Sequence, residues 1–132
     1  MQYLLTYLTD QSAMADATED EMRDWLDAWS AFDRAAIEAG VLIAGVPLED
    51  SSTATTLEQK ENGEKVTIDG PFAESKEQLG GFHLLECDNL DEALDWAQKV
   101  PLRTGYIEVK PARDLSALGY ETPTPGPIKV AA

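Results

Sequence analysis

Two stretches of this chain have the spacing of amphipathic helices, and each has a single apolar face. The first covers residues 22–39 behind a capping-box pair and ends at Gly40. The second covers residues 90–100, follows a cap formed by Asn89 with Glu92, and stops at Pro101. Two such helices cover only one face of a sheet, so the other face needs a second subunit or stays an open cleft. A homodimer is the natural expectation.

Short apolar stretches before, between and after these helices predict strands. They lie at residues 2–8, 41–46, 53–59, 65–69, 82–87 and 106–110. Asn62-Gly63 predicts a tight hairpin turn between the third and fourth of them, with positive φ at both residues. The order strand, helix, strand, hairpin, strand, helix, strand predicts an α+β fold, a ferredoxin-like sandwich with an inserted hairpin.

Length and composition limit the domain organisation. The 132 residues suit one domain, which we place at 1–114. Residues 115–132 contain Pro123, Pro125 and Pro127, which predict an extended tail, either mobile or laid across a partner.

The formal net charge of −15 disfavours nucleic acids and anionic membranes as partners. A single cysteine, Cys87, excludes an internal disulfide and a CxxC metal site, and it fits a reducing cytoplasm. No signal peptide or membrane-spanning segment is expected. The motifs of nucleotide binding, Ser-triad hydrolysis and zincin chemistry are absent from the sequence, so we expect no cofactor.

The most distinctive segment is 69-DGPFAESKEQLGGF-82. With "AGVLIAGVPL", "TATT", "LDEALDWA" and "IEVKPARD", it makes the chain similar to the DGPF-domain branch of the YCII-related family, from Gln2 to about Asp114. The resemblance implies a dimeric α+β barrel. Some relatives are proposed to be enzymes that use a His–Asp pair without metal, and some are associated with alternative sigma factors.

The resemblance does not carry the His–Asp pair over directly. The YCII branch places its histidine in the first helix, where this chain has Phe32, and Asp50 aligns with the partner aspartate. The histidine of this chain, His83, lies on a different strand. The dyad is therefore not expected in the family's arrangement.

The DGPF segment has two interpretations. Pro71 and Gly70 favour a rigid turn in which Asp69 accepts backbone hydrogen bonds and Phe72 plugs the core. The alternative is a pocket rim, which would also use two charged side chains that the turn leaves unexplained. On this interpretation the candidate ligand-binding residues are Phe72, Glu74, Lys76 and Tyr106. Turn chemistry explains Asp69 and Gly70 without a ligand, so the rigid turn is favoured.

His83 alternates with Leu85 and Cys87, so we expect it to be buried or at the sheet margin. A structural histidine is favoured over a general base. One His and one Cys on a strand do not make a metal site, and none is expected.

The sheet face away from the helices offers a further candidate site. Glu86, Glu108, Tyr106 and Lys110 are expected to converge near one cleft, where carboxylates move protons, or else to solvate a dimer rim. The candidate catalytic residues are therefore Asp69, His83, Glu86 and Glu108.

Three functions follow from these candidates. The first is a dimeric binding or accessory protein for a small apolar or weakly basic molecule, beside a sigma-factor-type regulator. The second is a cofactor-independent lyase or isomerase that uses acid–base chemistry. The third is a structural partner for another protein. The sequence favours the first and does not decide whether the protein is an enzyme.

Overall fold

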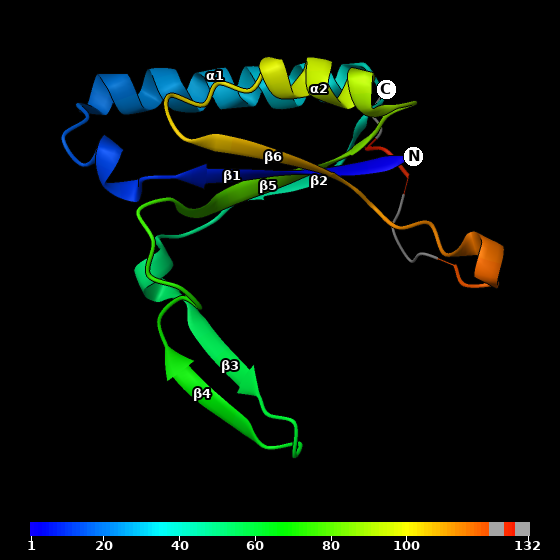
Figure 1. Ribbon diagram of the computed structural model, residues 1–132. Coiled ribbons are helices and arrows are strands. Elements are labelled where there is room, and N and C mark those ends of the chain that lie inside the picture. The colour runs from blue at the N-terminus through cyan, green and yellow to red at the C-terminus, as the bar shows by residue number, and fades with distance from the viewer. Residues whose placement is uncertain (122–125, 129–132) are drawn as a thin grey trace.

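The computed structural model describes residues 1–121 and 126–128. Two helices lie on one side of a four-stranded sheet, and a two-stranded hairpin projects from the other side (Figure 1). The elements are β1 (Gln2–Thr9), η1 (Gln11–Met14), α1 (Glu19–Glu38), β2 (Leu42–Pro47), η2 (Ser51–Thr53), β3 (Thr55–Gln59), β4 (Lys65–Asp69), β5 (Gln78–Glu86), α2 (Leu90–Gln98), β6 (Tyr106–Pro111) and η3 (Ser116–Leu118).

The strand order in the large sheet is β2-β5-β1-β6, and each neighbouring pair is antiparallel. The units β1-α1-β2 and β5-α2-β6 interleave in this order, as in a ferredoxin-like sandwich. Both predicted helix caps are present: Thr18 accepts from Glu21 N, and Asn89 accepts from Glu92 N. The predicted α+β fold is confirmed.

The core lies between the sheet and the helices. Alternate side chains of β1, namely Tyr3, Leu5 and Tyr7, point into it, and Leu5 and Leu85 are fully buried. Cys87 is buried too, and this burial raises the pKa of its thiol to about 11. The thiol is therefore protonated at neutral pH and a poor nucleophile.

The β3–β4 hairpin turn differs from the prediction. Gly63 has φ of 87°, but Asn62 does not have a positive φ. Gly63 N donates to Lys60 O at 3.0 Å and Lys60 N donates to Glu64 O at 2.8 Å, so the loop has three residues and needs only one left-handed position. The expectation of positive φ at both residues was wrong.

Strand β5 begins at Gln78, four residues before the predicted start at residue 82. Gly80 and Gly81 lie inside it, although glycine is depleted in strands. A Cβ at Gly81 would come 3.1 Å from Val46 O, so the absence of a side chain lets β2 approach closely.

The chain after β6 begins with the short turn η3, which ends at Gly119 with φ of 82°. Ile128 N donates to Leu42 O at 2.6 Å, which places residue 128 beside the edge strand β2. Pro123 and Pro125 lie outside the described residues, so the predicted extended tail is not tested there. Within residues 1–121 and 126–128, no helix combines the length and apolar character needed to cross a membrane.

Candidate functional site

His83 lies between two polar partners on the helix side of the sheet. Its Nδ1 is 2.6 Å from the Tyr7 hydroxyl oxygen, and its Nε2 is 2.7 Å from Asp33 Oδ1. Tyr7 comes from β1 and Asp33 from α1, which packs above. Tyr7 pairs with Gly81 and Leu5 pairs with His83, so Tyr7 and His83 are diagonal neighbours on one face of the sheet. We call Tyr7, His83 and Asp33 the relay.

Aromatic rings and a glycine fix the imidazole in place. The Trp29 ring lies parallel to it within 7°, with centroids 6.0 Å apart, and the Phe32 ring meets it edge-on at 5.1 Å. On β2, a Cβ at Gly45 would come 2.5 Å from His83 Cδ2. Only glycine at this position leaves space for the ring, so the orientation of His83 depends on Gly45.

The relay opens on a cavity of about 540 Å³ between α1, η1 and the ends of the strands. We call it the aromatic cavity. Its walls include the relay residues together with Trp25, Trp29, Met14, Val46, Leu48, Leu102, Asp10, Asp50 and Arg103. Trp25 Nε1 donates to Pro101 O at 3.0 Å, which anchors one wall. Trp25 and Trp29 both line the cavity.

The electrostatics of the aromatic cavity are negative. Hydrogen bonds from Ser12 hold the pKa of the Asp10 carboxyl below its usual range, and those from Ser52 do the same for Asp50. Both carboxylates therefore stay ionised at neutral pH. With Asp33, three acidic side chains face one basic side chain, Arg103. The cavity favours neutral or cationic molecules over anions.

The partners of His83 define its tautomer. When the Asp33 carboxylate is ionised it can only accept, so Nε2 carries a hydrogen and Nδ1 of a neutral imidazole accepts from the Tyr7 hydroxyl. Both ring nitrogens are then occupied. The Asp33 side chain is 47% exposed, and its second oxygen has no hydrogen-bond partner among the described residues. A molecule in the cavity would therefore meet Tyr7 Oη or Asp33 rather than a ring nitrogen.

The Tyr7 hydroxyl should stay protonated to high pH. Burial, and then the negative charge of Asp33, raises its pKa above the ordinary value of about 10. The unfolded chain ionises Tyr7 near pH 10, so the raised pKa should make stability fall as the pH rises above that value. Tyrosinate absorbance is titrated against pH for the native chain and for Tyr7→Phe. Below the pH at which the chain unfolds, the two curves should coincide, because Tyr7 stays protonated. In denaturant the difference should appear near pH 10. A native midpoint at or below pH 10 would contradict the assigned burial.

The sequence located one relay residue of three. His83 is 7% exposed, so the expected burial is confirmed, but its pairing with Asp33 was missed. A signal for Asp33 exists: it lies four residues after Trp29, at the edge of the apolar stripe of α1, and follows Phe32. For Tyr7, the only sequence signal is that it shares a face of β1 with Tyr3 and Leu5, because alternate side chains of a strand point the same way.

The DGPF residues lie away from the relay. The expectation that Phe72 plugs the core is wrong, because its side chain is 92% exposed beside the projecting hairpin. Gly70 does have the unusual backbone expected, with φ of 107°. Asp69, Glu74 and Lys76 do not line the aromatic cavity.

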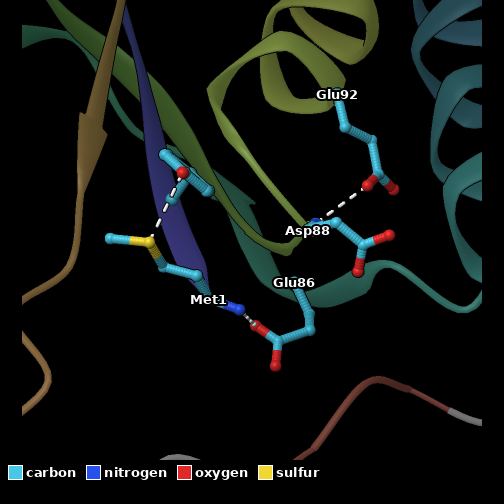
Figure 2. Close-up of polar contacts among 5 residues, drawn as sticks. Met1, Glu86, Asp88 and Glu92 are labelled. Carbon is cyan, nitrogen blue, oxygen red and sulfur yellow. Dashed lines mark hydrogen bonds and ion pairs between the residues drawn. The ribbon is translucent and has the colours of Figure 1, made fainter.

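The predicted convergence of charges on the open face does not occur. Glu86 pairs with Gln2, whereas Glu108 pairs with Thr6, so the two carboxylates lie four residues apart along β1. Glu86 Oε2 forms an ion pair with the amino group of Met1 at 3.1 Å (Figure 2). Tyr106 and Glu108 share a face of β6, but neither lines the aromatic cavity.

Comparison with known proteins gives the family. The model of the YCII-related domain matches residues 1–116. The chain belongs to the YCII-related family. An uncharacterised protein of Rhizobium meliloti (strain 1021) is 39% identical to it over 114 residues, which cover 84% of this chain and 91% of that protein. In this YCII-related protein the histidine comes from β5 and its carboxylate partner is Asp33 of α1. Asp50, which the resemblance suggested as the partner of a histidine, lies in the cavity wall instead.

No group of three His, Cys, Asp or Glu side chains among the described residues is arranged to hold a metal ion. The chemistry that these residues offer is acid–base chemistry through the relay.

Proposed function

We propose that this chain binds a small, apolar or weakly basic organic molecule in the aromatic cavity and exchanges a proton with it through the relay. The observation that carries the proposal is His83, buried and held at both ring nitrogens beside a cavity of about 540 Å³. That volume is within the range of small-molecule sites, which are mostly apolar with a few convergent polar groups.

The walls support an apolar or weakly basic ligand. Two indole rings and the Tyr7 ring offer aromatic faces, to which organic cations are attracted as well as apolar groups. The three carboxylates of the cavity add to this preference for positive charge.

The relay supports proton transfer. A proton taken from the ligand by Tyr7 Oη displaces the hydroxyl proton onto His83 Nδ1, and the imidazolium that forms is stabilised by Asp33 at 2.7 Å. The reverse order returns a proton to the ligand. Because the raised pKa of Tyr7 disfavours a free tyrosinate, Tyr7 acts as a neutral carrier between ligand and imidazole. Such a relay suits an isomerase or lyase that abstracts a proton beside a carbonyl.

The test uses probes of matched size and two readouts. Benzylamine, benzyl alcohol and benzoate are titrated against the native chain by tryptophan fluorescence, because Trp25 and Trp29 line the cavity. We expect benzylammonium to bind most tightly and benzoate least. The exchange of the α-protons of 2-tetralone in D₂O, followed by NMR, should be accelerated by the native chain. His83→Gln should lower that acceleration by about 100-fold or more.

The outcomes separate the two parts of the proposal. Binding without accelerated exchange would leave a binding or accessory protein and overturn the enzyme. Exchange unchanged by His83→Gln would overturn the relay. If no probe binds at millimolar concentration, the aromatic cavity is not the ligand site.

We also propose a homodimer that covers the open face of the sheet. This face carries Leu4, Thr6, Leu8, Ala44, Val46, Phe82, Leu84, Tyr106, Glu108 and Lys110. Its centre is apolar and neither helix covers it (Figure 1). A second copy would bury it and form the dimeric α+β barrel. Action beside a sigma-factor-type regulator and a cytoplasmic location remain predictions.

A further inference from the structure

The DGPF turn, residues 69–72, leaves its aromatic ring in solvent. Phe72 is 92% exposed, more than any other large apolar side chain of the described residues. Ile68, which pairs with Thr56 on the adjoining hairpin, is also exposed. Single exposed apolar residues are ordinary, but a phenylalanine ring this exposed on a projecting segment is a candidate contact residue.

A second cavity lies beside this ring. It has a volume of about 720 Å³, and we call it the DGPF cavity. Its lining includes Leu8, Leu48, Ala54, Pro71, Leu79 and Phe72 itself. Half of its lining residues are apolar and suit an aromatic side chain, and the exposed ring of Phe72 lies at its edge.

We propose that Phe72 inserts into the DGPF cavity of a second copy of this chain, and that the second copy's Phe72 inserts in return. Ring and cavity belong to the same segment, so a two-fold axis supplies a ring to each cavity and a cavity to each ring. The inference rests on the homodimer proposed above, and it names Phe72 as the residue that anchors one copy to the other.

The position of the hairpin favours a second copy as the occupant. The β3–β4 arm extends from the end of the sheet on the side opposite the helices (Figure 1). Leu8 belongs both to the open sheet face and to the DGPF cavity, so the two surfaces are continuous. A copy that covers the open face therefore lies next to the arm.

The inserting segment is uncharged at its centre, although Asp69 and Glu74 flank it. The chain has a net charge of −15, so two copies repel each other over most of their surfaces. Residues 70–73 are Gly-Pro-Phe-Ala and carry no charge. The DGPF cavity contains the carboxylates of Glu49 and Glu77, and the inserting ring brings no further charge to them.

The contact reaches the candidate site through Leu48. This side chain lines the DGPF cavity and also the aromatic cavity. The partner's Phe72 would pack against Leu48 and hold that wall of the aromatic cavity in place.

Sedimentation equilibrium of the full chain tests the anchor. The native chain, Phe72→Ser and the control Leu118→Ser are compared from nanomolar to high micromolar concentration. Leu118 is also exposed, at 72%, but it lies on η3 at the other end of the sheet (Figure 1). Each dimer contains two Phe72 contacts, so we expect Phe72→Ser to raise the dimer dissociation constant by about 100-fold or more, and Leu118→Ser to leave it unchanged.

Cross-linking locates the contact independently. A chain with Phe72→Cys is mixed with a chain with Thr53→Cys, which lines the DGPF cavity, under mild oxidation. Cys87 is buried, so the introduced thiols are the reactive ones. The mixed disulfide should form faster than either homodimeric disulfide.

The outcomes distinguish this inference from the proposals it rests on. If the native chain is a dimer and Phe72→Ser has the same dissociation constant, the anchor is wrong and the homodimer stands. A native chain that is monomeric throughout overturns both, while ligand binding in the aromatic cavity remains a separate measurement.

Discussion

Replacing His83 with alanine should lower the free energy of unfolding by about 3–4 kcal/mol, one of the larger effects of any single substitution in this chain. The side chain is 7% exposed and contacts the rings of Tyr7, Trp29 and Phe32. Alanine removes this packing, and it also leaves the buried Tyr7 hydroxyl without its partner at 2.6 Å. Denaturant melts at neutral pH measure the change.

His83→Phe separates the two contributions. It restores most of the ring volume but neither nitrogen. We therefore expect it to lower the free energy of unfolding by about 1–2 kcal/mol, because the Tyr7 hydroxyl is left without a partner. A loss below about 1 kcal/mol for His83→Ala would contradict the burial and bonding that define the relay.

Gly45→Ala should cost about 2–3 kcal/mol, a large effect for the addition of one methyl group. The new Cβ would lie 2.5 Å from His83 Cδ2 and 3.0 Å from Phe82 O. Movement of the imidazole away from the new Cβ would strain its hydrogen bonds to Tyr7 and Asp33. We therefore expect lower stability together with slower probe exchange.

Two controls test the cause. Gly80→Ala places a Cβ 3.2 Å from the rotatable Thr9 hydroxyl and should cost less than about 1 kcal/mol. In a His83→Ala background the ring is gone, so Gly45→Ala should lose most of its cost in a double-mutant cycle. An undiminished cost there would show that Gly45 does not act through His83.

Local elements were predictable from the sequence because their signals are local. The Thr18 and Asn89 caps, the Gly40 stop and the apolar stripes depend on residues within one or two turns of helix. The order of the elements along the chain indicated the ferredoxin-like sandwich, and two helices left one sheet face open. The start of β5 was missed because Gly80-Gly81 has a low propensity for strands. In the folded chain β2 packs closely against these glycines, and this tertiary contact outweighs the low propensity.

The candidate site was only partly predictable. Alternation along β5 placed His83 inside, but its partners are 50 and 76 residues away in the chain. No spacing rule connects residues so distant. The carboxylates chosen instead, Glu86 and Glu108, share a sheet but differ by four positions in strand register, which the sequence does not encode locally.

By itself, the sequence determined an α+β domain with two caps, two helices, six strands and an acidic surface, because hydrophobic periodicity and turn chemistry act over a few residues. Only the tertiary structure decided that Asp33 rather than Asp50 meets His83, that Gly45 makes room for the ring, and that Phe72 is exposed. Those facts depend on how β1, β2, β5 and α1 pack against one another, and packing is a property of side chains that are distant in the chain.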